Sequence, residues 1–182
     1  MSSQPTLPPQ LETIFSTEKE PEALFTALMP ALCEVLRCDR CFLYLRDPNT
    51  KQGRITHCYA TSSEWEDMTR PDWEEEGEIA AKDPLMAIAF RTPEAVFVED
   101  IETAGPAIVN LPFERDVYKH RALIHAPIYC QGQLCGILEP CVFNQPRVWT
   151  EGDRAVTALV QEKLAPAVND YLNSNPISKT HA

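Results

Sequence analysis

The sequence lacks any run of about 18 apolar residues, the length that a membrane-spanning helix needs. Its first 15 residues have neither a basic start nor a long apolar stretch, so they do not resemble an export signal. Neither a GxxxxGK[ST] loop nor a GxGxxG turn occurs, and these are the glycine-rich motifs that cradle phosphates. We therefore expect a cytoplasmic protein with no membrane span and no phosphate-binding loop of these types.

Basic residues are few, with 16 Lys and Arg against 27 Asp and Glu and a net charge of -11. Residues 64–78 alone hold eight acidic residues and one arginine. An acidic surface repels phosphate backbones, so we expect no direct binding of nucleic acid. The acidic segment has two interpretations: a solvated loop kept open by self-repulsion, or a docking arm for a basic protein partner, with Trp65 and Trp73 as apolar anchors.

The seven cysteines do not show the doubled pair spacing of a zinc ribbon. Cys38 and Cys41 have CxxC spacing, but neither a second pair nor a pair of histidines lies nearby. Buried reduced thiols are the simplest interpretation, because free cysteine is among the most buried residue types. A redox pair, a thiophilic metal site or an iron-sulfur centre is the alternative.

A length of 182 residues suits one domain. We expect a flexible tail at residues 1–16, a single domain at residues 17–172 and a second tail at residues 173–182. Thr17 and Glu20 have the spacing of a capping box, which predicts a first amphipathic helix running to about residue 37. Further helix starts are predicted at Asp83-Pro84 and at Thr150 with Asp153, and strands at residues 41–45, 54–60 and 95–98.

Two apolar runs, residues 122–129 and 134–143, flank Gln131-Gly132, and this pattern predicts a β-hairpin. Side chains alternate across a strand, so four side chains of the second run should share one face: Cys135, Ile137, Glu139 and Cys141. His125 belongs to the first run, and whether it lies on the same side depends on a register that the sequence leaves open. We predict that these five residues, with Tyr59 from an earlier strand, line a ligand pocket.

The last third of the chain resembles the GAF domain, and within that family it is most similar to the bilin-binding modules of cyanobacteriochromes and phytochromes. The residues that carry the resemblance are Arg121-Ala122, Pro127-Ile128, Gln133-Leu134, Gly136-Ile137-Leu138 and Pro146-Arg147-Val148-Trp149. The resemblance implies an α+β fold, in which a central antiparallel sheet of five or six strands has the first and last helices on one face. A pocket covered by a lid at residues 101–117 is implied on the other face, and a homodimer formed through the helices is expected.

The chain departs from the bilin-binding subgroup at its attachment point. Where that subgroup carries a Cys-His pair, this sequence has Asn110 and Leu111, so the usual thioether to a tetrapyrrole is missing. Cys135 stands at the place of a family tryptophan and Cys141 at that of a histidine. Residues 59–129 contain no cysteine that would supply a second thioether.

The sequence thus predicts a free-standing sensory or regulatory module, not an enzyme, that signals to a protein partner through a small-molecule ligand or a redox state. One alternative is a photoreceptor-like domain that holds a tetrapyrrole without the usual attachment. A second is a thiol-based redox, metal or iron-sulfur sensor. The third alternative is an enzyme similar to the free methionine sulfoxide reductases, with Cys135 or Cys141 near His125 as the nucleophile.

His120 lies near the start of a predicted strand and is expected to be solvated.

Overall fold

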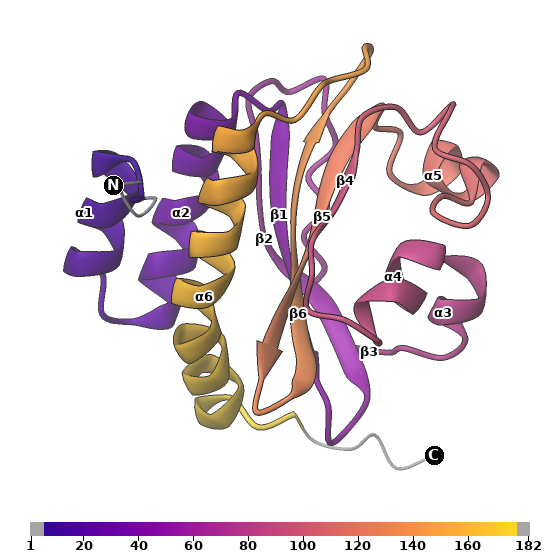
Figure 1. Cartoon of the computed structure of the whole chain (residues 1–182). Coiled ribbons are helices and arrows are strands. Elements are labelled where there is room, and N and C mark those ends of the chain that lie inside the picture. Colours follow the sequence, from indigo (N-terminus) through magenta and orange to yellow (C-terminus); the bar gives the residue numbers. More distant parts are fainter. Residues whose placement is uncertain (1–5, 178–182) are drawn as a thin grey trace.

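A six-stranded antiparallel sheet divides the molecule into two layers (Figure 1). The computed structural model describes residues 6–177. In chain order the strands are β1 (Arg40–Asp47), β2 (Gln52–Ala60), β3 (Glu74–Glu75), β4 (Val96–Val98), β5 (Ala122–Cys130) and β6 (Gln133–Val142). They lie in the sheet as β3-β2-β1-β6-β5-β4. The expected α+β class and the strand count are confirmed.

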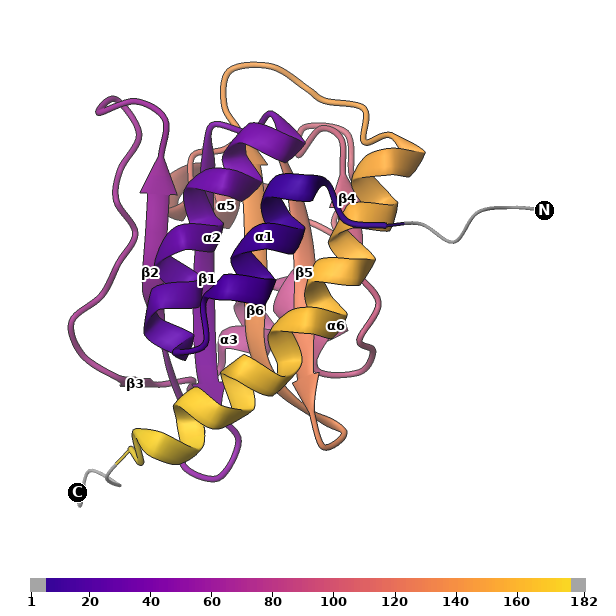
Figure 2. The ribbon, with the colours of Figure 1, turned by 90° about the vertical axis from the view of Figure 1, so that its left-hand side faces the viewer.

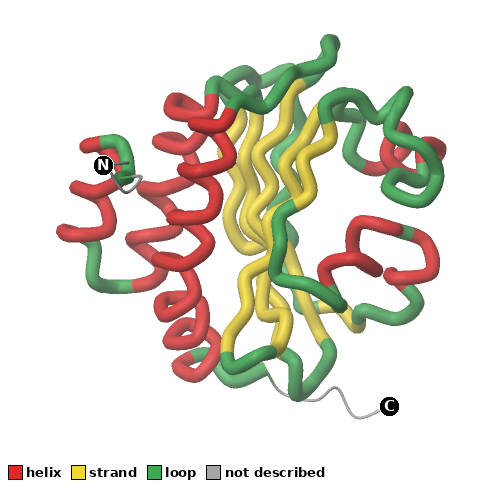
Figure 3. Tube along the Cα trace, in the orientation of Figure 1, coloured by secondary structure: helices red, strands yellow, loops and turns green. Residues whose placement is uncertain are grey.

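The two faces of the sheet carry different kinds of cover. The helices are α1 (Pro9–Thr17), α2 (Pro21–Leu36), α3 (Ile79–Lys82), α4 (Pro84–Ala89), α5 (Leu111–Val117) and α6 (Glu151–Ser174). Helices α1, α2 and α6 cover one face (Figure 2), and the short helices α3, α4 and α5 with long loops cover the other (Figure 3). Within the described residues, no helix has the length and apolar character that crossing a membrane requires.

The helix-covered face holds the main apolar core. Helix α2 buries Phe25, Leu28 and Leu32 completely, at the helical spacing that the sequence shows. These side chains pack against alternate residues of the strands, among them Leu43 and Leu138. The intervening strand residues point to the other face of the sheet, where polar side chains are buried as well.

The predicted start of the last helix is confirmed by its cap. The Thr150 hydroxyl accepts a hydrogen bond from the Asp153 backbone at 3.1 Å, and the Asp153 carboxylate accepts one from the Thr150 backbone at 2.9 Å. Asp83 likewise accepts from the Leu85 backbone at 2.9 Å and begins α4. Both helices therefore begin where the sequence predicts.

The β5–β6 hairpin has the turn that its sequence predicts, and it also contains an irregularity. Gln131 and Gly132 both have positive φ, 53° and 78°, as a tight hairpin turn requires. Just before the turn, Ile128 pairs with Gly136 but Tyr129 pairs with Leu134. Cys135 lies between these two partners in β6 and has no partner of its own in β5. This extra residue forms a β-bulge, which redirects its side chain.

The prediction of a flexible N-terminal tail at residues 1–16 is wrong from Pro9 onward, where α1 forms and packs on α2. Leu11 is fully buried and Leu7 is 6% exposed, so this segment adds to the core. The predicted capping box does not form, because the Thr17 hydroxyl donates to the Thr13 carbonyl and α2 begins only at Pro21. The apolar residues of this segment were too few for their periodicity to predict a helix.

Replacing Leu11 by Ala tests this correction. Deleting a fully buried leucine side chain costs about 2–5 kcal/mol of unfolding free energy, whereas the same change in a tail costs nothing. Urea denaturation of Leu11→Ala should show this loss, and Gln10→Ala, an exposed neighbour on the same helix, should unfold as the parent does. Equal urea midpoints for Leu11→Ala and Gln10→Ala would show that this segment is a tail, as the sequence predicts.

Candidate functional site

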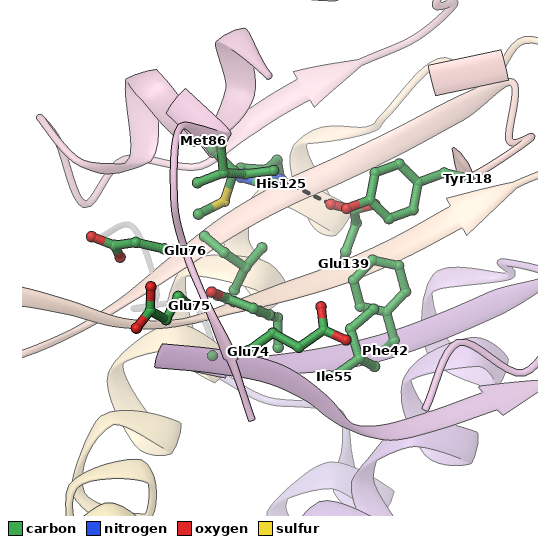
Figure 4. A pocket seen from close by; sticks show the side chains of 13 residues that line it. Phe42, Ile55, Glu74, Glu75, Glu76, Met86, Tyr118, His125 and Glu139 are labelled. Carbon is green, nitrogen blue, oxygen red and sulfur yellow. Dashed lines mark hydrogen bonds and ion pairs between the residues drawn. The ribbon is translucent and has the colours of Figure 1, made fainter. Parts of the chain in front are cut away.

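A cavity of about 150 Å³ lies between the sheet and the segment that carries β3, α3 and α4 (Figure 4). Its sheet wall comes from β1, β2, β5 and β6, and its cover from residues 74–86 together with Tyr118 after α5. Its lining includes Phe42, Tyr44, Ile55, Glu74, Glu75, Glu76, Met86, Tyr118, His125, Ile137 and Glu139. The cavity thus combines aromatic, aliphatic and acidic side chains on the face opposite α2 and α6.

His125 and Glu139 form a buried pair on the sheet wall of the cavity. The register of β5 with β6 pairs Leu123 with Cys141 and Ala126 with Leu138, so His125 lies across from Glu139. His125 Nδ1 is 2.8 Å from a Glu139 carboxylate oxygen, and the two residues are only 3% and 4% exposed (Figure 4). His125 Nε2 and Glu139 Oε1 have no hydrogen-bond partner among the described residues. Two buried polar atoms of residues that line this cavity therefore lack a hydrogen-bond partner.

A second buried pair adjoins the first. His120 Nε2 lies 2.7 Å from the Glu114 carboxylate, and His120 Nδ1 lies 3.7 Å from Glu139 Oε1. Burial lowers the pKa of His120, but hydrogen bonds with Cys141 and Glu114 and the charge of Glu139 outweigh it and raise the pKa to about 10. His120 is thus a buried imidazolium between two carboxylates. The prediction that it is solvated is wrong, because nothing in the sequence around it indicates the partner on α5.

Asp83 brings a further carboxylate close to this cluster. It caps α4 and is 2% exposed. Burial raises its pKa to about 6, the charges of Glu114 and Glu139 add to the rise, and His125 opposes it. Three buried acids, Asp83, Glu114 and Glu139, therefore lie in the same region as two buried histidines, His120 and His125.

Aromatic rings form much of the remaining wall. Tyr118 stacks on His120 with ring centroids 5.5 Å apart and planes at 8°, and Phe42 stacks on Tyr118 at 5.9 Å and 15°. Tyr44 contributes a third ring, two residues after Phe42 in β1. Burial raises the pKa of Tyr44 to about 12. The ring faces offer an apolar surface with negative electrostatic potential.

Cys135 does not lie on the face that strand parity predicted for it. The bulge leaves it without a register partner, and its side chain joins the helix-side core. One extra residue reverses the alternation, so a bulge sends a side chain to the opposite face. Ile137 and Glu139 keep the predicted face and line the cavity. Their binding of a ligand stays a prediction.

Two other predicted lining residues also lie elsewhere. Cys141 is on the cavity side of the sheet, but it packs with Leu123 and Phe143 in a separate apolar cluster. Tyr59 is 41% exposed and borders a surface hollow beside α2, next to Cys58. The cavity therefore receives His125, Ile137 and Glu139 of the six predicted residues, and gains the aromatic rings and Met86 that sequence reasoning missed.

The lid predicted at residues 101–117 covers a different part of the sheet. Ile101 and Val109 from this segment pack on the cluster around Leu123 and Cys141. The cavity is instead covered by residues 74–86, whose Glu76 forms a two-point ion pair with Arg46 of β1. Residues 74–78 of this cover belong to the acidic segment 64–78, for which the sequence predicts a solvated loop or a docking arm, since its charge gives no sign of a contact with the sheet.

The thiols show no arrangement typical of a metal site. Among the described residues, no group of three or more His, Cys, Asp and Glu is placed to hold a metal ion. The seven cysteines are free. A hydrogen bond with Cys33 raises the pKa of Cys38, and burial raises that of Cys41. The CxxC pair therefore consists of buried thiols that disfavour the reactive thiolate form.

The comparison with protein families decides the identity of this architecture. The sequence model described as the GAF domain matches residues 20–168. The chain belongs to the GAF domain family. Comparison with curated protein sequences gave no match.

Solved structures show the same fold at low sequence identity. The phycocyanobilin-bound GAF domain from a cyanobacterial phytochrome superposes with a TM-score of 0.71 at 16% identity, covering 92% of this chain and 96% of that one. The GAF domain of an Acinetobacter phosphoenolpyruvate-protein phosphotransferase gives 0.69 at 13%, with 93% and 96% covered. Free methionine-R-sulfoxide reductase from Neisseria meningitidis gives 0.65 at 16%, with 91% and 88% covered.

The residues of this GAF domain do not fit a tetrapyrrole. No cysteine lines the cavity, and the Asn110 amide is bonded to the Lys82 carbonyl at 2.8 Å while its oxygen caps α5. The cavity volume of about 150 Å³ is below the ~300–1,000 Å³ typical of pockets for drug-sized ligands, and an open-chain tetrapyrrole is larger still. The site is suited to a much smaller molecule.

The raised pKa of Asp83 has a consequence for stability. Because the folded protein holds this proton more tightly than the unfolded chain does, stability falls as pH rises from about 4 to about 6, and the penalty is complete above about 6. Asn retains the capping oxygen without the charge. Asp83→Asn should therefore be more stable than the parent at pH 8, by about 2–3 kcal/mol at ~1.4 kcal/mol per pKa unit.

Urea denaturation at several pH values measures this effect. The difference between parent and Asp83→Asn should shrink as the pH falls below about 6 and approach zero only below the ordinary pKa of 3.8, where Asp83 is protonated in the unfolded chain as well as in the folded parent. Asp170→Asn, an exposed carboxylate on α6, provides the control. A difference for Asp83→Asn that does not change with pH would show that the pKa of Asp83 is not raised in the folded protein.

Proposed function

We propose that this GAF domain is a sensory or regulatory module that binds a small molecule in the cavity and conveys its presence to a protein partner. The observation that carries the proposal is the pair of buried, unpartnered polar atoms, His125 Nε2 and Glu139 Oε1, at a cavity of about 150 Å³. A buried polar atom without a hydrogen bond costs about 1–3 kcal/mol, and a ligand that supplies the bond removes this cost.

The cover of the cavity supplies a route by which ligand binding is transmitted. Arg46 on β1 pairs with Glu76 of the cover, donates to the Leu134 carbonyl at 3.0 Å and lies over the Phe90 ring at 5.0 Å. A ligand that contacts both the sheet and the cover stabilises one arrangement of the two, and this shifts the population of the cover. The partner is expected to recognise the cover in that state. A homodimer stays a prediction.

The geometry gives no support to catalysis by a cysteine nucleophile. Such catalysis needs a thiol and a base that both reach the substrate. Cys141 lies near His120, but it is fully buried in a cluster outside the cavity, and Cys135 faces the helices. We therefore propose a non-enzymatic role, in which incubation with free methionine sulfoxide and a thiol donor yields no methionine.

A redox role is the second candidate, and one observation favours it. Cys130 and Cys135 border the same surface hollow beside the end of α6, and a hydrogen bond from Cys130 lowers the pKa of Cys135. Oxidation by a peroxide would convert the Cys135 thiolate to a sulfenic acid, and attack by Cys130 would release water and form a disulfide. Peroxide treatment followed by counting of free thiols tests this role: two thiols should be lost, and none in Cys135→Ser, which lacks the thiolate that reacts with the peroxide.

Native mass spectrometry of the protein from its own host tests ligand binding directly. A non-covalent adduct much smaller than a tetrapyrrole, on a protein with no visible absorbance, is the expected result. Ile137→Phe should abolish the adduct, because the larger ring enters the cavity, whereas Ile128→Val on the helix-facing side of β5 should retain it. A coloured protein with a bilin-sized adduct would contradict the proposal.

A further inference from the structure

The lining of the cavity is rich in carboxylates that lack a basic partner. Glu76 is paired with Arg46, but Glu74 and Glu75 at the rim form no ion pair with any described residue, and both are exposed. Glu139 lies deeper and is 4% exposed. No lysine or arginine lines the cavity. A ligand that enters meets negative charge at the rim and again at the sheet wall.

The hydrogen bonds within the site determine whether an unpartnered atom of the lining can accept or donate a hydrogen bond. Glu139 accepts through one carboxylate oxygen from His125 Nδ1. Its other oxygen, Oε1, has no hydrogen-bond partner among the described residues, and His120 Nδ1 at 3.7 Å is beyond hydrogen-bond distance. An ionised carboxylate oxygen only accepts hydrogen bonds. The complementary ligand is therefore a donor of N–H hydrogen bonds.

Electrostatics favours a donor that is positively charged. Asp83, Glu114 and Glu139 are all buried, and burial together with the charges of Glu114 and Glu139 raises the pKa of Asp83 against the opposing effect of His125. A cation near Glu139 would reduce the repulsion among these acids. The rings of Phe42 and Tyr44 line the cavity, and a cation is attracted to a ring face by the aromatic quadrupole, an interaction worth about 0.5–2 kcal/mol.

We infer that the cavity binds a small organic ammonium ion, with its nitrogen donating to Glu139 and its carbon skeleton against the aromatic rings. The inference rests on the proposed function and specifies the ligand class. A bare metal ion is a poorer match, since the described residues offer no cluster of three ligating side chains and the walls are largely carbon. The volume of about 150 Å³ suits one ring and one amine group.

Three probes with the same ring separate charge from shape: benzylammonium, benzyl alcohol and benzoate. Isothermal titration with the full-length protein at pH 7.5 should show binding of benzylammonium at least about tenfold tighter than of benzyl alcohol, with no binding of benzoate. Methyl NMR signals of Met86 and Ile137 should shift with benzylammonium, which places the probe in the cavity. Neutral benzyl alcohol binding as tightly as the cation would overturn the inference.

Glu139→Gln tests the residue assigned to the ammonium group. Gln keeps the shape and an acceptor for His125 but removes the charge, so benzylammonium affinity should fall at least about tenfold while that of benzyl alcohol changes less than about twofold. Glu162→Gln, an exposed change of the same type on the opposite face of the sheet, should bind as the parent does. If Glu139→Gln does not fold, the comparison of the three probes on the parent protein still decides the question.

The outcomes separate this inference from the proposed function. If benzoate or benzyl alcohol shifts the cavity signals more than benzylammonium does, small-molecule binding stands and the ammonium assignment is wrong. If none of the three probes shifts them, the ammonium assignment is wrong, and native mass spectrometry on the host protein alone decides whether any ligand is sensed.

Discussion

The hydrogen bond between His125 and Glu139 is the interaction on which the site depends. It joins the neighbouring strands β5 and β6 on the face away from the long helices and keeps the Glu139 carboxylate buried. A buried carboxylate persists only when its partners compensate for lost hydration. Here a second histidine, His120, adds to that compensation, and it is held in turn by Glu114 of α5.

This chain of alternating acids and imidazoles explains why the short helices on the cavity face stay close to the sheet. Asp83 begins α4 and its pKa responds to the charge of His125, while Glu114 of α5 pairs with His120, so each of these helices places one buried carboxylate near a histidine of the site. Their apolar contacts are limited to small clusters, such as the one around Leu85 and Val98. Charge and hydrogen bonding therefore organise this layer, while the α2 and α6 layer is organised by apolar burial.

The same contrast accounts for how a GAF domain changes its ligand without changing its fold. The apolar core on the helix side is independent of the cavity, and the solved relatives superpose on this chain at only 13–16% identity. The cavity depends instead on the side chains that project from β5, β6 and the cover. In this chain these side chains are largely acidic and aromatic. The small volume of the cavity that they line is consistent with a small ligand.

Local patterns in the sequence were sufficient for the elements that short-range chemistry specifies. The turn at Gln131-Gly132, the caps at Asp83 and Thr150, and the shared face of Ile137 and Glu139 were all predicted, because each depends on residues within a few positions of one another. The tertiary structure alone decided which face Cys135 occupies, since a bulge arises from the pairing of two strands. It also decided the burial of His120 and the identity of the cover, because the partners of these residues lie on other elements and leave no periodic signal in the chain.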